Sequence, residues 1–147
     1  METVRVAFEP FPGDDVRQFV VNGVDNFNIA ATGLPAYFPV NVLLRGEDGD
    51  VLGGLLGQLW GGWLQIVYLW VAEPYRGQGF GAQLMQTAEI YARRRGAIGA
   101  TLETHSFQAR PFYERLGYTV FGTLEDYPPG HAKHFMSKRL DDIPAAS

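Results

Sequence analysis

A glycine-rich segment at the middle of the chain constrains its fold more than any other feature. Residues 76–81 read Arg-Gly-Gln-Gly-Phe-Gly and join an apolar run to an amphipathic run. Glycine adopts positive φ without steric cost and has no Cβ to hold a ligand away. A loop of this kind at the start of a helix turns several N–H groups toward one anion, and the helix dipole favours negative charge there. The segment therefore predicts a phosphate site between a strand and a helix.

Three phosphate-binding patterns compete for this segment. A P-loop requires a lysine after its last glycine, and this chain has none there. Gly77, Gly79 and Ala82 fit the dinucleotide pattern G-x-G-x-x-G/A. Glu103 follows where an acid of that fold would bind the ribose. The third pattern, [Q/R]-x-x-G-x-[G/A], begins at Arg76.

The apolar run before the loop predicts a β-hairpin. Residues 51–72 carry no charged side chain and are long enough to cross a membrane as a helix. However, Gly61 and Gly62 lie at the centre of the run, between two tryptophans. A Gly-Gly pair between two apolar segments is typical of a hairpin turn. Two antiparallel strands are therefore expected in place of a membrane helix.

Periodicity predicts the other elements. Strands are expected at residues 4–8, 42–45, 98–104, 118–124 and 134–140. Helices are expected after the capping pair Asp14-Asp15, from Gly81 to near Gly96, and between residues 109 and 117, with a short additional helix within residues 30–39. The tail, residues 141–147, is expected to fray. The length of 147 residues suits a single domain.

A second motif decides between the patterns. Residues 112–118 read Phe-Tyr-Glu-Arg-Leu-Gly-Tyr and follow the glycine loop after a predicted helix and strand. The two motifs in this order resemble the GNAT superfamily of N-acetyltransferases, over residues 40–140. Ser106 stands where that family often has an asparagine. The order of elements also disfavours the dinucleotide fold, because the loop follows an antiparallel hairpin.

The resemblance implies an α/β fold of the GNAT type in a small bacterial-type enzyme. Its single domain would span residues 1–147, with a mixed, mostly antiparallel sheet of about six or seven strands and about four helices on both faces. It also implies acetyl-CoA as the co-substrate. The pantetheine arm would pair with backbone groups at residues 70–72, where the Val71 N–H would polarise the thioester oxygen. The pyrophosphate would bind at residues 76–81. The residues concerned are Trp70, Val71, Ala72, Arg76, Gly77, Gln78, Gly79, Phe80 and Gly81.

Tyr113 is the catalytic acid that the resemblance implies, protonating the departing sulfur. In solution this transfer is uphill by about 2 kcal/mol, since a phenol has a pKa of about 10 and a thiol about 8.5. A local shift of the pKa could erase that difference. Glu73 and Glu103 are the expected general bases, with His105 and His131 as further candidates. Glu103 and His131 are also expected to bind the acceptor.

Charge and composition argue against several classes of binding partner and cofactor. A net charge of −4 with only two lysines offers no broad basic surface for nucleic acid. The absence of cysteine excludes disulfides and a thiolate nucleophile. No metal is expected, because His131 and His134 lack an evident third ligand. The first residues lack the apolar core of a signal peptide, so a cytoplasmic protein without a membrane segment is expected.

The predicted function is transfer of an acetyl group from acetyl-CoA to a primary amine of a small molecule or peptide. Which amine serves, and whether other acyl groups are used, stays open. A homodimer also stays open. Two alternatives remain: a CoA-binding sensor or structural module without turnover, and a dinucleotide-binding domain.

Overall fold

The chain forms two units, residues 1–36 and residues 37–147. The computed structural model describes residues 2–142, so the predicted frayed tail lies largely outside the described residues. In the first unit no strand forms at residues 4–8, and the prediction of a strand there is wrong. A strand requires a neighbour to pair with, and residues 4–8 pair with no strand within residues 2–142. The prediction of one domain stays a prediction.

Helix α1 (Asp14–Thr32) contains the predicted amphipathic helix but is longer. Its N-cap is Gly13, with φ of 87°, and no side chain caps it, so Asp14 and Asp15 lie in the first turn. There their charges complement the helix dipole. Gly33 ends the helix in the left-handed conformation, and its N–H bonds the carbonyl of Ile29 at 2.8 Å. The predicted extra helix within residues 30–39 is therefore wrong, because α1 takes its first residues and a strand begins at Phe38.

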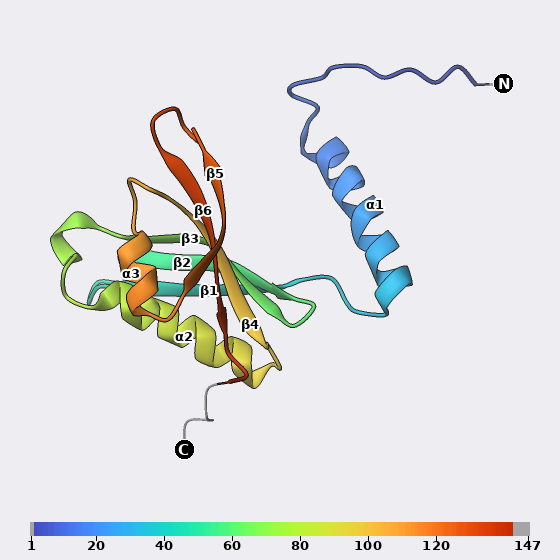
Figure 1. Cartoon of the computed structure of the whole chain (residues 1–147). Coiled ribbons are helices and arrows are strands. Elements are labelled where there is room, and N and C mark those ends of the chain that lie inside the picture. The colour runs from blue at the N-terminus through green and yellow to red at the C-terminus, as the bar shows by residue number, and fades with distance from the viewer. Residues whose placement is uncertain (1, 143–147) are drawn as a thin grey trace. The chain divides into compact units, whose positions relative to one another are not determined.

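The second unit is built on a six-stranded sheet with the order β1-β2-β3-β4-β6-β5. All neighbouring strands are antiparallel except β3 and β4, which are parallel. The strands are β1 (Phe38–Arg45), β2 (Val51–Trp60), β3 (Trp63–Val71), β4 (Gly99–His105), β5 (Thr119–Glu125) and β6 (Ala132–Arg139). The mixed, mostly antiparallel sheet confirms the predicted fold class (Figure 1). Within residues 2–142 the α-helices are three, one fewer than predicted.

The hairpin predicted within residues 51–72 is confirmed. Gly61 and Gly62 connect β2 to β3 with φ of 60° and 84°, values that favour glycine. Trp60 pairs with Trp63 across the turn. No helix among residues 2–142 is long and apolar enough to span a membrane.

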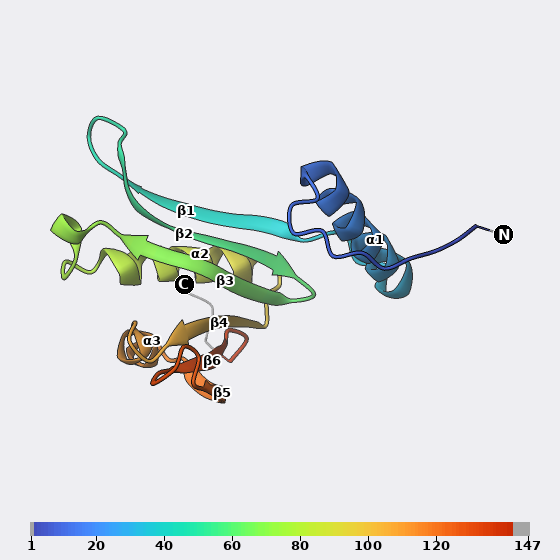
Figure 2. The ribbon, with the colours of Figure 1, turned by 90° about the horizontal axis from the view of Figure 1, so that it is seen from above.

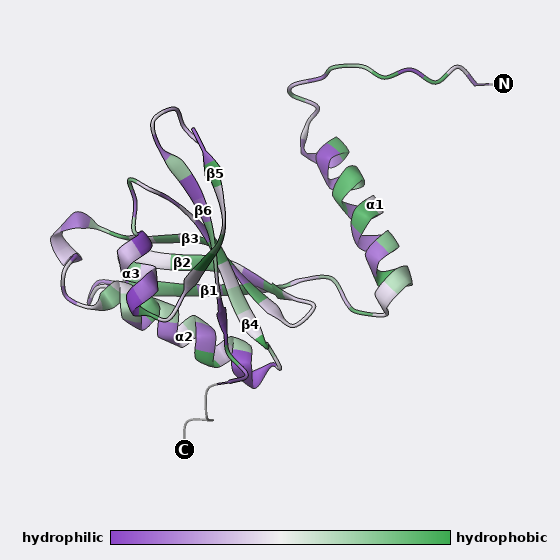
Figure 3. Ribbon diagram, viewed as in Figure 1, coloured by the Kyte–Doolittle hydropathy of each residue, from purple (hydrophilic) through white to green (hydrophobic). Residues whose placement is uncertain are grey.

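Helix α2 (Phe80–Arg94) covers one face of strands β1 to β3. Its apolar side chains pack with Leu55 and Leu64, which are fully buried on these strands. Figure 3 shows green, hydrophobic residues along β1 and β3. The buried side chains of α2 are Leu84, Met85, Ala88, Glu89 and Ala92. The short helix α3 (Arg110–Arg115) contributes Tyr113 to the same core.

One buried carboxylate joins α2 to the end of the chain. Glu89 is 6% exposed, and its two oxygens accept hydrogen bonds from the Tyr118 hydroxyl at 2.9 Å and from the Lys138 ammonium at 2.7 Å. Burial first, and then the Glu89 charge, raise the pKa of Tyr118. The phenol therefore stays protonated and keeps donating to the carboxylate. Both partners are needed, because an unpaired buried charge is strongly destabilising.

Strands β3 and β4 diverge after a short parallel pairing. They pair only from Trp63–Gly99 to Ile66–Leu102. At the same level the register of β2 and β3 shifts, because Gly57 pairs with Ile66 and Leu56 with Tyr68, leaving Val67 as an extra residue in β3. A bulge of this kind bends its strand and increases the local twist. Beyond it β3 continues beside β2 and β4 beside β6, as two separate groups (Figure 2).

The bulge depends on a glycine, and substituting Gly57 by alanine tests this. A Cβ at residue 57 would lie 2.6 Å from the carbonyl oxygen of Gln65, closer than real Cβ atoms approach backbone. Because the backbone must shift, we expect the free energy of unfolding to fall by about 1–3 kcal/mol. Gly122→Ala in β5 is the control, since its Cβ would meet Phe135 at an ordinary 3.8 Å. Equal chemical-denaturation midpoints for the two variants would contradict this account.

Candidate active site

The glycine loop presents unpaired backbone donors. It runs from the 3₁₀ turn η1 (Glu73–Tyr75) to α2, with Gly77 and Gly79 at φ of 74° and 84°. The first i→i−4 hydrogen bond of α2 runs from the Gln83 N–H to the Gly79 carbonyl at 3.1 Å. The N–H groups of residues 77–82 donate to no acceptor within residues 2–142. Six donors at a helix N-terminus form a site for an anion.

A cavity of about 380 Å³ adjoins these donors. It is lined by Val71, Tyr75, Arg76, Gly77, Gly79, Phe80, Gly81, Ala82, Phe112 and Arg115. Sequence reasoning missed Arg115, which adds a cation to this wall. The sequence did contain a clue to Arg115, because a residue three positions after Phe112 lies on the same face of helix α3. Gln78 does not line the cavity, and its side-chain amide donates to the Pro74 carbonyl at 3.2 Å.

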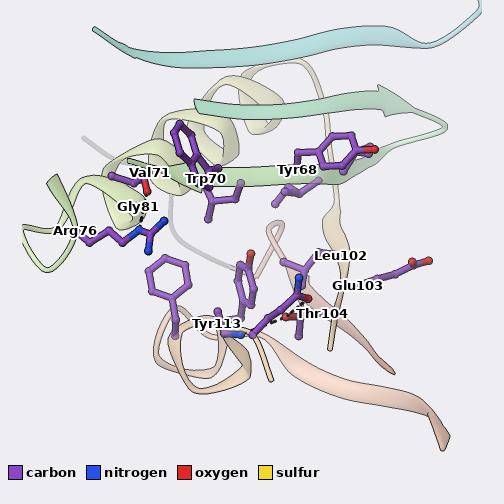
Figure 4. A pocket seen from close by; sticks show the side chains of 15 residues that line it. Tyr68, Trp70, Val71, Arg76, Gly81, Leu102, Glu103, Thr104 and Tyr113 are labelled. Atoms are coloured by element: carbon purple, nitrogen blue, oxygen red, sulfur yellow. Dashed lines mark hydrogen bonds between the residues drawn. The ribbon is translucent and has the colours of Figure 1, made fainter. Parts of the chain in front are cut away.

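A larger cavity of about 620 Å³ lies where β3 and β4 diverge (Figure 4). Strand β3 contributes Ile66 through Val71, and β4 contributes Leu102, Glu103 and Thr104. The far wall comes from Gln108 and Ala109 and from Phe112 and Tyr113 of α3. In Figure 4 the Tyr113 ring rises into the space between these strands, with Arg76 and Gly81 to one side. Both cavities share Val71, Arg76, Gly81 and Phe112, so they are parts of one cleft.

The end of β3 has one backbone amide that faces this cleft. The N–H of Ala72 donates a hydrogen bond to the Leu52 carbonyl at 2.8 Å, so residue 72 points its donor toward β2. Because antiparallel pairs alternate, Trp70 shares that orientation and Val71 has the opposite one. The Val71 carbonyl accepts a bond from the Arg76 Nε at 2.8 Å. Of the three residues predicted to meet the pantetheine arm, Val71 is thus the one whose N–H faces the cleft.

Tyr113 combines burial with a free hydroxyl. The residue is 8% exposed and its ring packs edge-on against Phe112 and Tyr118, at centroid distances of 5.1 and 6.1 Å. Its hydroxyl makes no hydrogen bond within the described part of the chain. Burial raises the pKa of Tyr113, so the direction of the shift is opposite to the one that would ease proton transfer. The same burial disfavours a thiolate beside it, so the thiol pKa rises as well.

The two predicted general bases lie in different places. Glu103 lines the larger cavity, but its carboxylate points away from Tyr113 in Figure 4. Its Oε2 is paired with the Lys133 ammonium at 2.7 Å, which raises the pKa of Lys133. Glu73 begins η1 and is exposed, and it lines neither the larger cavity nor the one beside the glycine loop. The structure therefore brings Glu103, and not Glu73, to the cleft with Tyr113.

A third cavity of about 260 Å³ continues the cleft on the side of Glu103. It shares Glu103 and Gln108 with the larger cavity and adds His105 and Lys133. The amide oxygen of Gln108 accepts the His105 N–H at 2.7 Å and so fixes the turn after β4. This turn was not predicted, because it depends on a side-chain bond.

His131 and Ser106 hold the loops beside this third cavity. The His131 ring packs edge-on against Phe107 at 5.0 Å, outside the cavity lining. The Ser106 hydroxyl accepts the N–H of Ala132 at 3.0 Å and ties the turn to β6. Among residues 2–142 no cluster of three or more acidic, histidine or cysteine side chains could hold a metal ion.

Comparisons with known proteins agree with this geometry. Residues 13–118 match the model of the acetyltransferase (GNAT) family. The blasticidin-S acetyltransferase of Streptomyces morookaense is 44% identical over 96 residues, which are 65% of this chain and 71% of that protein. The crystal structure of an acetyltransferase from Bacillus cereus has a TM-score of 0.77 at 31% identity, covering 90% of this chain and 97% of that chain.

A third similarity concerns the fold alone. A crystal structure from Bacillus anthracis in complex with acetyl coenzyme A has a TM-score of 0.61 at 19% identity, and covers 69% of this chain and 62% of that chain. The family model spans both sequence motifs, the glycine loop at residues 76–81 and residues 112–118. The chain belongs to the GNAT family of acetyltransferases.

Proposed function

We propose that the protein transfers an acetyl group from acetyl-CoA to a primary amine of a small molecule or peptide. The observation that carries this proposal is the single cleft that has unpaired backbone donors at one end and the Tyr113 hydroxyl further along. The donors at residues 77–82 and the Arg115 guanidinium would hold the pyrophosphate. Arg76 would support this end indirectly, through its bond to the Val71 carbonyl. NAD also has a pyrophosphate, so the choice between CoA and NAD requires a direct measurement.

The chemistry places opposite demands on the two sides of the thioester. The Val71 N–H would bond the carbonyl oxygen as negative charge develops there, and such a donor contributes about 3–4 kcal/mol to catalysis. The neutral amine attacks the carbonyl carbon, a C–N bond forms and the C–S bond breaks. Tyr113 would then donate its proton to the leaving sulfur, and the proton lost by the new amide restores the phenol.

The acceptor would enter from the side of Glu103, where the third cavity continues the cleft. Glu103 is proposed to contact it from the wall of this cavity, and His131 from the loop between β5 and β6, outside the cavity lining. Blasticidin S is the first acceptor to test, because the named substrate of the 44%-identical relative gives the most specific lead. If the protein binds acetyl-CoA but releases no thiol in the presence of any amine, a CoA-binding module is favoured instead.

Cofactor choice can be measured by thermal denaturation. We expect CoA at 100 times its dissociation constant to stabilise the protein by about 2.7 kcal/mol, whereas NAD shifts the melting temperature little. Gly79→Ala should weaken CoA binding, since φ of 84° is strained for alanine and the loop must change shape. Gly49→Ala, at φ of 86° in the β1–β2 turn, carries the same strain away from the cleft and should keep the CoA shift. A larger shift with NAD than with CoA would refute the acetyltransferase assignment.

The Tyr113→Phe variant tests the catalytic acid. It keeps the ring packing and removes one hydroxyl that has no hydrogen-bond partner within residues 2–142, so folding and CoA affinity should change little. Steady-state thiol release should fall by about 10²- to 10⁴-fold in kcat, because the proton is needed only as the thiolate forms. Tyr91→Phe on α2 is the matched control, since Tyr91 stacks on Phe38 and lines none of the three cavities of the cleft. A kcat within about threefold of wild type in a folded Tyr113→Phe variant would remove Tyr113 from the mechanism.

A further inference from the structure

His105 ends β4 with its ring held in one orientation. Its Nδ1 lies 2.9 Å from the backbone carbonyl oxygen of Tyr127. The ring also stacks on Phe107, with centroids 5.3 Å apart and planes 13° apart, and contacts the Tyr127 ring at 5.5 Å. The turn after β4 and the loop between β5 and β6 thus clamp one imidazole from two sides.

This contact determines which nitrogen of the neutral ring carries the proton. A carbonyl oxygen only accepts hydrogen bonds, so Nδ1 must be the donor. The other nitrogen, Nε2, then has a free lone pair, and no described residue donates a hydrogen bond to it. A histidine whose one nitrogen donates to a fixed acceptor while the other accepts is the arrangement of a general base.

His105 lines the third cavity, which opens into the cleft with Tyr113. That cavity and the larger one have Ile66, Val67, Tyr68, Leu102, Glu103 and Gln108 in common. His105 would therefore line the path of an amine that entered the cleft from this side. The charged neighbours from the packed elements are Glu103 on β4 and Lys133 on β6, and the titratable ones in the loops are Tyr127 and His131.

Glu103 is less suited to the same task. Its carboxylate is bound to the Lys133 ammonium at 2.7 Å, and the ammonium also lies 4.8 Å from the centre of the Tyr127 ring. A proton taken by Glu103 would weaken this ion pair. Proton transfer to His105 Nε2 breaks no bond present in the structure.

We propose that His105 is the general base that prepares the acceptor, an inference that rests on the proposed acetyl transfer. The acceptor arrives as an ammonium, R–NH₃⁺, and its N–H bond breaks as Nε2 takes the proton. The neutral amine then attacks the thioester while the imidazolium keeps its Nδ1–H bond to Tyr127. The imidazolium releases its proton to water, which accounts for the one proton that the overall reaction liberates.

Two substitutions separate the base from the clamp. His105→Asn places an amide N–H where Nδ1 stood and preserves a donor to the Tyr127 carbonyl, but removes Nε2. His105→Phe removes both nitrogens and keeps an aromatic ring for stacking. The matched control is His134→Asn on β6, because His134 Nδ1 also makes one bond, to the Thr123 hydroxyl at 3.1 Å, and lines none of the three cavities. Glu103→Gln tests the competing carboxylate.

The kinetic test measures kcat/KM against pH with acetyl-CoA and blasticidin S, spermidine or phenylethylamine as acceptor. Wild type should lose activity at low pH as one group becomes protonated. His105→Asn and His105→Phe should lower kcat/KM by about 10²-fold or more and abolish this acidic limb, with CoA binding unchanged. Loss of the limb in Glu103→Gln but not in His105→Asn would assign the base to Glu103 and overturn the proposal.

A second measurement needs no acceptor. In the ¹⁵N NMR spectrum of the neutral ring, His105 should carry its proton on Nδ1, and a proton on Nε2 would overturn the proposal. The wild-type protein distinguishes failure of the proposed acetyl transfer from failure of the role of His105. If wild type releases no thiol with any of the three amines, the acetyl transfer and the role of His105 are both overturned for these acceptors. If wild type is active and His105→Asn is equally active, only the role of His105 is overturned.

Discussion

The divergence of β3 from β4 is the constraint on which the rest of the structure depends. Two parallel strands that stayed paired would satisfy each other's backbone groups and leave no room between them. In this protein the pairing ends at Ile66–Leu102, at the level of the bulge opposite Gly57. The freed edge of β3 supplies the Val71 amide, and the freed space admits Tyr113 from α3, while His105 at the end of β4 lines the adjoining third cavity.

Electrostatics differ along this cleft in a way that suits its proposed use. At the loop, backbone dipoles and the Arg115 guanidinium favour a bound anion. No neighbouring group has to gain or lose a proton for this. Around Tyr113, burial disfavours charge of either sign, so the phenol and the thiol would both end neutral only with the proton of the new amide returning to Tyr113 as Tyr113 protonates the sulfur. At the outer end, the Glu103–Lys133 pair and His105 form a polar wall where an ammonium can arrive.

The sequence predicted the elements that carry a strong local signal. The hairpin around Gly61 and Gly62 has both its turn chemistry and its apolar arms within 22 residues, and the glycine loop depends only on its own glycines and the helix that follows. The predicted strand at residues 4–8 failed because alternation alone does not supply a pairing partner. Details that depend on distant contacts were out of reach, such as the Lys133 partner of Glu103 and the carbonyl of Tyr127 that sets the His105 tautomer.

The Glu89 carboxylate links parts of the chain that sequence motifs treat as separate. It lies on the helix that begins at the glycine loop, and it accepts bonds from Tyr118 at the end of the second motif and from Lys138 on the last strand. Each motif taken alone could be exchanged between relatives, but the bonds of Glu89 make the two motifs depend on each other. Suppose that residues 109–118 were replaced by those of a relative with an apolar residue at position 118. The buried Glu89 carboxylate would then lose the hydrogen bond from Tyr118. Positions 89, 118 and 138 should therefore vary together across the family, independently of the acceptor.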